Sequence, residues 1–132
     1  MEDIIAKHKY TSEKSPWSIA ISKTYISFGE FGPQRRLKSK TSFSWYGVKT
    51  ITIEPVGRIR LFSKVRSRLI LEFDETRPHI DKHPNPLSEF DLSVDDLAKF
   101  LEGALIDLRI PYEKSSKYKY ALPDYYKSLN SF

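Results

Sequence analysis

The chain has 132 residues, 39% of them hydrophobic and 14% aromatic, and its 22 lysines and arginines against 17 aspartates and glutamates give a formal net charge of +5. A chain of this length is expected to form one domain that buries roughly 68% of the surface exposed when it is unfolded, so its core requires neither a metal nor a disulfide. It contains no cysteine, which excludes disulfides, a thiol nucleophile and thiolate-ligated metal centres.

Residues 1–15 mix charged residues with two adjacent isoleucines. They lack the apolar core of a secretory signal, and we expect a flexible segment and a cytoplasmic protein. In residues 17–21, large apolar and small residues alternate, and Ile26 and Phe28 repeat this period. A period of two predicts strands. After a turn-rich piece, two further strands are predicted around Gly47, one with Phe43 and Trp45 and one with Ile51 and Ile53.

Arginines alternate with apolar residues at 58–61, and the run 68–73 places Leu69, Leu71 and Phe73 on one face. These two segments predict a hairpin with a basic outer side. Residues 76–88 contain three prolines. Each proline removes a backbone donor and restricts the residue before it, so we expect a loop here. A short last strand is predicted at Phe90 and Leu92.

The strongest local pattern predicts a helix over residues 94–108. Ser93 is a good N-cap, and aspartates in the first turn suit the helix dipole. Apolar residues fall on a single stripe, which predicts a helix packed on the core; they are Val94, Leu97, Leu101, Ala104, Leu105 and Leu108. Gly103 is unfavourable inside a helix, and we expect another element to approach it closely.

Several short antiparallel strands followed by one amphipathic helix predict an α+β fold. Its sheet is expected to be strongly bent, or a partly open barrel, with five to seven strands and one C-terminal helix. This element order, from Trp17 to Ile110, resembles that of pleckstrin-homology-like domains, and residues 45–51 (WYGVKTI) resemble the strand and turn before the middle hairpin of bacterial members. The resemblance implies a core over residues 16–110, with 111–132 as a tyrosine- and lysine-rich extension. A cystatin-like or other curved-sheet fold is the alternative.

Catalytic and metal-binding patterns are weak. His79, Asp81 and His83 would lie on one side of an extended segment, but the flanking prolines and the missing second shell of hydrogen bonds argue against a metal site. The sequence has no nucleophile elbow, no glycine-rich phosphate loop and no paired carboxylates that resemble an acid–base dyad. We therefore expect a protein that is not an enzyme and that uses no metal or other cofactor.

Charge is strongly separated along the chain. Residues 35–68 contain ten basic residues and one acidic residue, whereas residues 69–113 contain eleven acidic and four basic residues. Separate faces of opposite charge could each steer a partner, or the two blocks could neutralise each other across a sheet. The candidate binding residues are the arginines of the predicted hairpin and tyrosines of the extension: Arg58, Arg60, Arg66, Arg68, Tyr118, Tyr120, Tyr125 and Tyr126.

These features favour a non-catalytic binding module for another protein, with an acidic partner surface, such as a stoichiometric inhibitor, an immunity protein or an adaptor. Tyrosines are common in binding surfaces, although this tail could instead pack back on its own sheet. Nucleic acid is the first alternative, because aromatic residues lie close to the basic block. The family resemblance also raises phosphoinositide binding, for which the first hairpin offers only Lys23.

Overall fold

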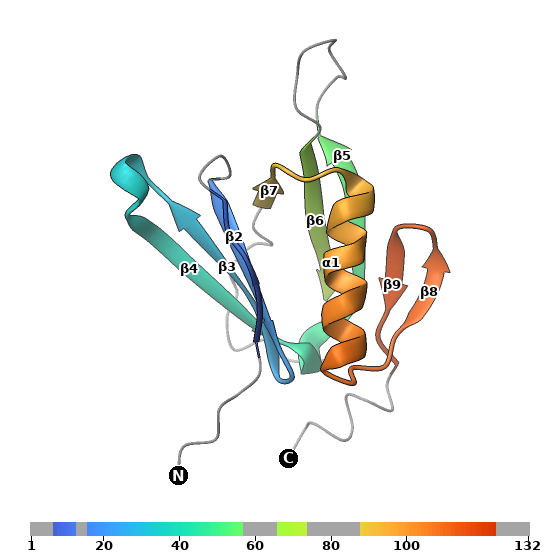
Figure 1. Ribbon diagram of the computed structural model, residues 1–132. Helices are drawn as coiled ribbons and strands as arrows, with labels where there is room; N and C mark the ends of the chain where they lie inside the picture. The colour runs from blue at the N-terminus through green and yellow to red at the C-terminus, as the bar shows by residue number, and fades with distance from the viewer. Residues whose placement is uncertain (1–6, 13–15, 57–65, 74–87, 124–132) are drawn as a thin grey trace.

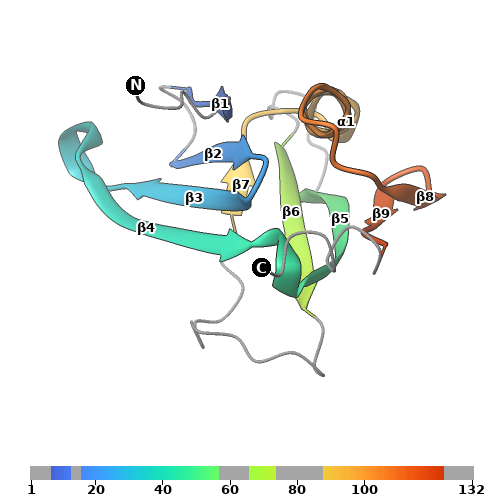
Figure 2. The same ribbon diagram turned by 90° about the horizontal axis from the view of Figure 1, so that it is seen from below.

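The computed structural model describes residues 7–12, 16–56, 66–73 and 88–123. Its first sheet has four antiparallel strands in chain order (Figure 1 and Figure 2): β1 (Lys7–Tyr10), β2 (Trp17–Ser22), β3 (Tyr25–Phe31) and β4 (Leu37–Ser44). The second sheet has the order β7-β6-β5-β9-β8, formed by β5 (Val48–Val56), β6 (Arg66–Phe73), β7 (Ser88–Phe90), β8 (Glu113–Ser116) and β9 (Lys119–Ala121). Two short 3-10 turns, η1 (Pro33–Arg35) and η2 (Trp45–Gly47), flank β4.

The core lies between the two sheets and the helix α1 (Val94–Asp107). Alternation sends one side of each strand inward, so Ile19 and Phe28 of the first sheet and Ile51 and Leu69 of the second are almost fully buried. The turn η2 joins β4 of the first sheet to β5 of the second. The helix α1 packs on β5 and β6 (Figure 2). The period-two segments of the sequence thus become the walls of one core.

The helix α1 confirms the prediction from the apolar stripe. The Ser93 Oγ atom accepts a hydrogen bond from the backbone N–H of Asp96 at 3.0 Å, which satisfies a donor of the first turn. Leu97, Leu101 and Leu105 are fully buried. The helix ends as Arg109 adopts a left-handed φ of 57° just before Pro111. Within the described residues, no helix has both the length and the apolar character needed to cross a bilayer.

The α+β class is confirmed, but the sheet differs from the one expected. The described residues form nine strands in two sheets, rather than five to seven in one, and these strands do not close into a barrel. The additional strands come from both ends of the chain. Strand β1 lies within the segment 1–15 that was expected to be flexible, and β8 and β9 lie beyond residue 110.

Strand pairing also differs from the sequence prediction. Strand β6 pairs with β5, with Glu54 opposite Arg68. The expected strand at 58–61 lies outside the described residues, as does most of the predicted loop 76–88. Trp45 belongs to η2 instead of a strand, and its buried indole N–H donates to the carbonyl of Ser22 at 2.8 Å. Leu92, which was predicted to belong to the last strand before the helix, lies two residues beyond the end of β7.

Candidate functional site

The predicted arginine patch is only partly present in the described residues. Arg66 is exposed at the start of β6. Arg68 is neutralised, because its guanidinium lies 3.4 Å from a carboxylate oxygen of Glu54 and 3.0 Å from one of Glu89. Arg58 and Arg60 lie outside the described residues. The second sheet therefore brings acidic partners to Arg68 and leaves it little free charge for a ligand.

The predicted tyrosine surface is also largely occupied. The Tyr120 ring is fully buried, and its hydroxyl donates to Glu102 at 2.9 Å. Burial, together with this hydrogen bond, raises the pKa of Tyr120 well above its usual value. Tyr118 is half-buried and donates to Asp95 at 2.6 Å, whereas Tyr125 and Tyr126 lie outside the described residues. Residues 113–121 thus extend the second sheet as β8 and β9, and Tyr120 and Leu122 enter the core.

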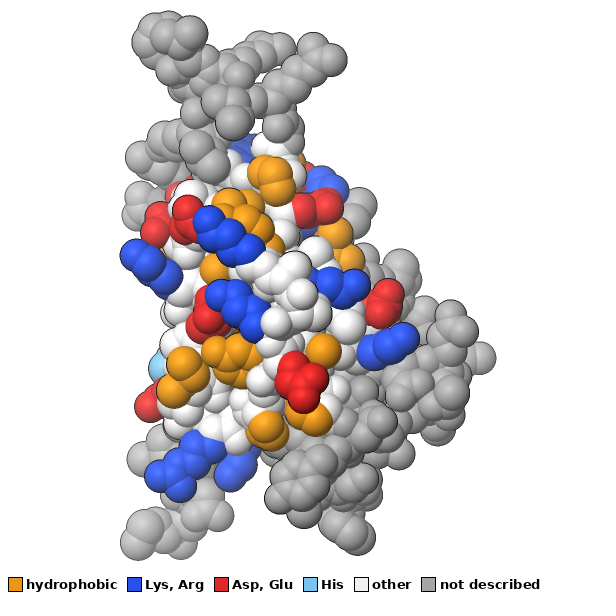
Figure 3. Space-filling view, turned by 90° about the vertical axis from the view of Figure 1, so that its right-hand side faces the viewer, with side chains coloured by type: hydrophobic (Ala, Val, Ile, Leu, Met, Phe, Trp, Pro, Cys, Tyr) orange, Lys and Arg blue, Asp and Glu red, His pale blue; other side chains and the backbone are white. Residues whose placement is uncertain are grey.

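Acidic and basic side chains are interspersed on the face of the molecule that carries β8 and β9 (Figure 3). Lys114 lies 3.3 Å from Glu102, and Lys117 lies 3.8 Å from Asp95. Such exposed pairs contribute little to stability, but they reduce the local net charge. This face does not present a field of one sign.

The outer face of the first sheet is different, because it carries basic side chains above a floor of small ones. We use the name outer face for the side turned away from the core, formed by Lys7, Lys9, Ser18, Ala20, Tyr25, Ser27, Gly29, Phe31, Leu37 and Lys40. The register places Lys9, Ala20 and Ser27 in one row across three strands, and Ser18, Gly29 and Lys40 in the next. Alternation explains this floor, since the same strands send Ile19, Ile26 and Phe28 to the core.

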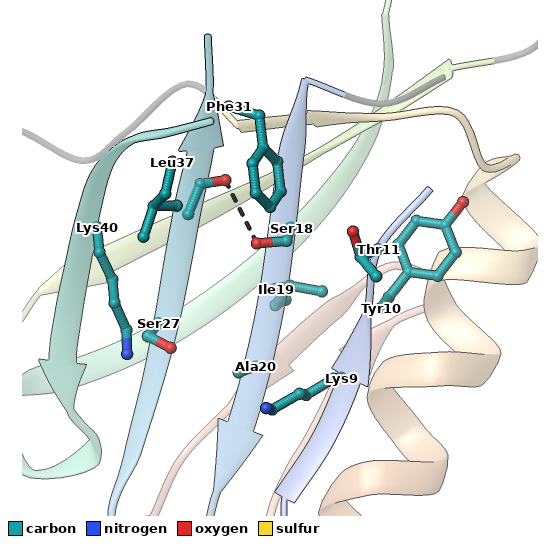
Figure 4. Close-up of a pocket in the computed structure, with 11 residues that line it drawn as sticks. Lys9, Tyr10, Thr11, Ser18, Ile19, Ala20, Ser27, Phe31, Leu37 and Lys40 are labelled. Carbon is teal, nitrogen blue, oxygen red and sulfur yellow. Dashed lines mark hydrogen bonds between the residues drawn. The ribbon is translucent and has the colours of Figure 1, made fainter. Parts of the chain in front are cut away.

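The floor is hollowed into a pocket of about 290 Å³ (Figure 4). Lys9 and Lys40 reach over it from opposite sides, with their ammonium groups near Ala20 and Ser27, and Phe31 and Leu37 form the other end. Leu37 is on this face because of a bulge: Glu30 pairs with Ser39 but Phe31 pairs with Leu37. The pocket therefore has a basic end and an apolar end.

Gly29 keeps the pocket open. A Cβ atom at this position would lie 2.8 Å from Ser18 Oγ and 3.1 Å from Leu37 Cδ1. Both distances are below ordinary van der Waals contact, so a larger residue would displace these side chains or fill the hollow. Ser18 Oγ itself donates to the Gly29 carbonyl at 3.4 Å.

Among the described residues, the positive charge on the outer face is not balanced by acids. In the described parts of the first four strands and their turns, Glu30 is the sole acidic residue. The Glu30 carboxylate lies 3.8 Å from Lys38 and accepts a hydrogen bond from Ser39 at 3.5 Å. Because Glu30 follows Gly29 in β3, its side chain points to the side of the sheet opposite the outer face. Neither Lys9 nor Lys40 forms an ion pair with any described residue. The hydrogen bond from Lys7 and the positive charges of Lys7 and Lys40 lower the pKa of Tyr25, although burial opposes this shift.

Two sets of contacts hold β1, and with it Lys7 and Lys9, in place. Tyr10 donates to Asp91 at 2.5 Å and Ser12 donates to the same carboxylate at 2.8 Å, while His8 lies 2.7 Å from Asp107 at the end of α1. Burial and the hydrogen bond to Asp91 raise the pKa of Tyr10 to about 12. Since neighbouring residues of a strand point to opposite faces, His8 and Tyr10 bind α1 and the segment before it while Lys7 and Lys9 line the outer face.

This site is not predicted from the sequence, because Lys7 and Lys9 belong to a segment expected to be flexible. A usable signal was the alternation itself, in which Ser18, Ala20, Ser27 and Gly29 occupy the non-core positions of two adjacent strands. No group of three metal-ligating side chains exists among the residues that the structure describes. The His79, Asp81 and His83 constellation lies outside them. Comparisons with protein-family models, with curated proteins and with solved structures find no match to this chain.

Proposed function

We propose that this protein is a non-catalytic binding module that captures a protein partner by binding an acidic surface of that partner. The observation that carries the proposal is the outer face of the first sheet, where Lys9 and Lys40 flank a pocket without a described acidic neighbour. A face of one sign attracts an oppositely charged partner over long range and raises the rate of association.

Two features favour a protein over a nucleic acid as the ligand. Single-stranded nucleic acids are bound by stacking bases on open aromatic rings. On the outer face, the guanidinium of Arg35 lies 4.3 Å from the centre of the Phe31 ring, and Lys7 lies 5.9 Å from that of Tyr25. Both rings thus already have a cation close by, whereas the apolar end of the pocket suits an aliphatic side chain of a protein.

The family resemblance suggests phosphoinositide binding as another possibility, which would use the first hairpin. The turn between β2 and β3 is Lys23-Thr24. One lysine provides little charge for a headgroup with several phosphates. The outer face collects more basic side chains than this turn.

The test is capture of partners from a cell extract on the immobilised full chain, at low and high salt and with nuclease treatment, followed by mass spectrometry. We expect a nuclease-resistant partner that the double variant Lys9→Glu/Lys40→Glu no longer retains. The matched control is Lys99→Glu/Lys119→Glu, which makes the same change in net charge at exposed positions of α1 and β9. Equal capture by the two double variants would contradict the proposal.

Direct titrations separate the alternative ligands. At near-physiological salt, we expect single-stranded and duplex oligonucleotides to bind no more tightly than the roughly 10⁻⁴ to 10⁻⁶ M that is typical of nonspecific contact. Submicromolar binding that Lys9→Glu/Lys40→Glu abolishes would replace the protein partner with nucleic acid. Co-sedimentation with phosphoinositide-containing vesicles, absent with phosphatidylcholine vesicles, would replace it with a lipid headgroup.

A further inference from the structure

We infer that the pocket on the outer face receives one acidic and one apolar side chain from the same face of a single extended segment of the partner protein. This inference rests on the proposed function and specifies what the partner inserts. It follows from the two ends of the pocket and from the distance between them.

The basic end fits a carboxylate. Lys9 and Lys40 come from the two outermost strands, and their ammonium groups lie near Ala20 and Ser27, respectively (Figure 4). A carboxylate placed between them accepts from two ammonium groups, and the Ser27 side chain also lines the pocket. Charge-assisted hydrogen bonds of this kind are stronger than hydrogen bonds between neutral groups. The small residues of the floor leave the space that such a group needs.

The apolar end fits an aliphatic side chain. Leu37 and Ile106 are the two large hydrophobic residues exposed among the described residues, and Leu37 is 56% exposed. It faces Phe31 across β3 and β4. A free phosphate or other small anion would occupy the lysine end alone and leave Leu37 in water. A partner that covers both ends removes this apolar surface from water.

The strand repeat sets the spacing between the two side chains. Ser27, Gly29 and Phe31 are successive outer-face positions of β3, and each residue of a strand advances the chain by roughly 3.3 Å. The Phe31–Leu37 pair therefore lies about 7 Å from the row of Gly29 and about 13 Å from the row of Ser27. An extended partner segment parallel to β3 has the same repeat. Its acidic and apolar residues match when they are two or four positions apart, and adjacent residues would point to opposite sides.

The first experiment is a titration of the ¹⁵N-labelled full chain, followed by NMR, with nine-residue serine- and threonine-rich peptides that contain one glutamate and one leucine. We expect peptides with the two residues two or four positions apart to shift the amide signals of Ala20, Ser27, Gly29 and Leu37. Adjacent placement, and glutamine in place of glutamate, should weaken binding at least tenfold. Inorganic phosphate serves as the small-anion probe. Equal binding of the adjacent or glutamine peptide, or phosphate affinity equal to that of the best peptide, would overturn the inference.

The second experiment fills the pocket without changing the charge. Ala20→Leu and, as an independent variant, Gly29→Ala place carbon atoms in the hollow and retain both lysines. We expect each to weaken peptide binding at least tenfold, while Thr52→Val, at a half-buried position of the second sheet, should bind as the wild type does. Circular dichroism verifies that each variant is folded.

The same variants distinguish the two proposals in the extract experiment. If Lys9→Glu/Lys40→Glu abolishes capture but Ala20→Leu and Gly29→Ala retain it, the acidic partner remains and the pocket inference is wrong. If none of these variants affects capture, the proposed function itself is wrong.

Discussion

Ser22 and Ser67 are both fully buried, but they differ in their hydrogen bonds. Ser22 Oγ accepts from the backbone N–H of Tyr25 at 3.2 Å and donates to the Tyr25 carbonyl at 3.4 Å. Ser67 Oγ has no hydrogen-bond partner among the described residues. We expect Ser22→Ala to lower the free energy of unfolding by about 1 kcal/mol, and Ser67→Ala to leave it unchanged or raise it, because a buried unpaired hydroxyl is destabilising.

Chemical denaturation of the two variants measures this difference. Ser88→Ala serves as a repeat of the Ser67 case, since the Ser88 hydroxyl is also buried without a described partner. A loss of more than 1 kcal/mol in Ser67→Ala would show that its hydroxyl has a stabilising partner.

Tyr10 makes stability depend on pH in the alkaline range. Its pKa rises from the ordinary 10.0 to about 12 in the folded protein. The contribution is therefore complete below pH 10 and is lost as the pH rises through 12, because the unfolded chain releases the proton first. We expect the stability difference between wild type and Tyr10→Phe to be constant up to pH 10 and to shrink between pH 10 and 12. Denaturation curves at several pH values test this, and a difference that grows with pH would contradict it.

The buried side of α1 contributes leucines to the core. Leu101 and Leu105 are fully buried, and α1 packs on β5 and β6 of the second sheet. We expect Leu101→Ala or Leu105→Ala to lower the free energy of unfolding by roughly 2–5 kcal/mol, because each leaves a cavity. Lys99→Ala, on the exposed side of the same helix, should change it little. Thermal and denaturant unfolding measure both, and a Leu101→Ala variant as stable as wild type would remove this helix from the core.

Gly103 also belongs to α1, and here the sequence-based expectation was wrong. A close approach by another element was expected, but a Cβ atom at Gly103 would have no described atom within 4 Å. The position is exposed. We expect Gly103→Ala to raise the free energy of unfolding by up to about 1 kcal/mol through helix propensity. A lower stability in denaturation would indicate that the glycine has a contact after all.

Local patterns predicted the elements, whereas their pairing depended on distant residues. The helix was predictable because its cap, its stripe and its stop lie within one short stretch. The partner of β5 on one edge is β9, and nothing near β5 in sequence specifies it. Similarly, the pocket depends on Lys9 and Lys40 lying on the same face of a sheet of four strands, which only the register of the sheet determines.

Residues beyond α1 also belong to the folded core. Strand β9 completes one side of β5, and Tyr120 and Leu122 are buried in the common core. We expect a chain truncated after residue 110 to lose cooperative unfolding, because the cut exposes the edge of β5 and the core beneath Tyr120. Circular dichroism melting tests this, with truncation after residue 123 as the control. A cooperative transition in the shorter chain would show that 16–110 is a sufficient core.

The fold also explains the separation of basic and acidic residues along the sequence. The acidic block neutralises basic residues within the second sheet, where Lys49 lies 3.9 Å from Glu72 and Arg68 lies 3.0 Å from Glu89. The lysines of the outer face lie in the first sheet, where Asp91 and Asp107 of the acidic block contact β1 through Tyr10 and His8 on the opposite side. Among the described residues, the net positive charge is thus concentrated in the first sheet and its turns.

The position of β9 next to β5 has a consequence for synthesis of the chain. Strand β5 is complete by residue 56, but its partner on one edge begins at residue 119. Ribosomes add roughly 5–20 residues per second, so this edge stays unpaired for several seconds while the rest of the chain is made. Such a contact closes a long loop, which slows folding. The synthesis of β9 therefore determines when this edge of β5 can be paired, and until then the edge is open to other nascent chains.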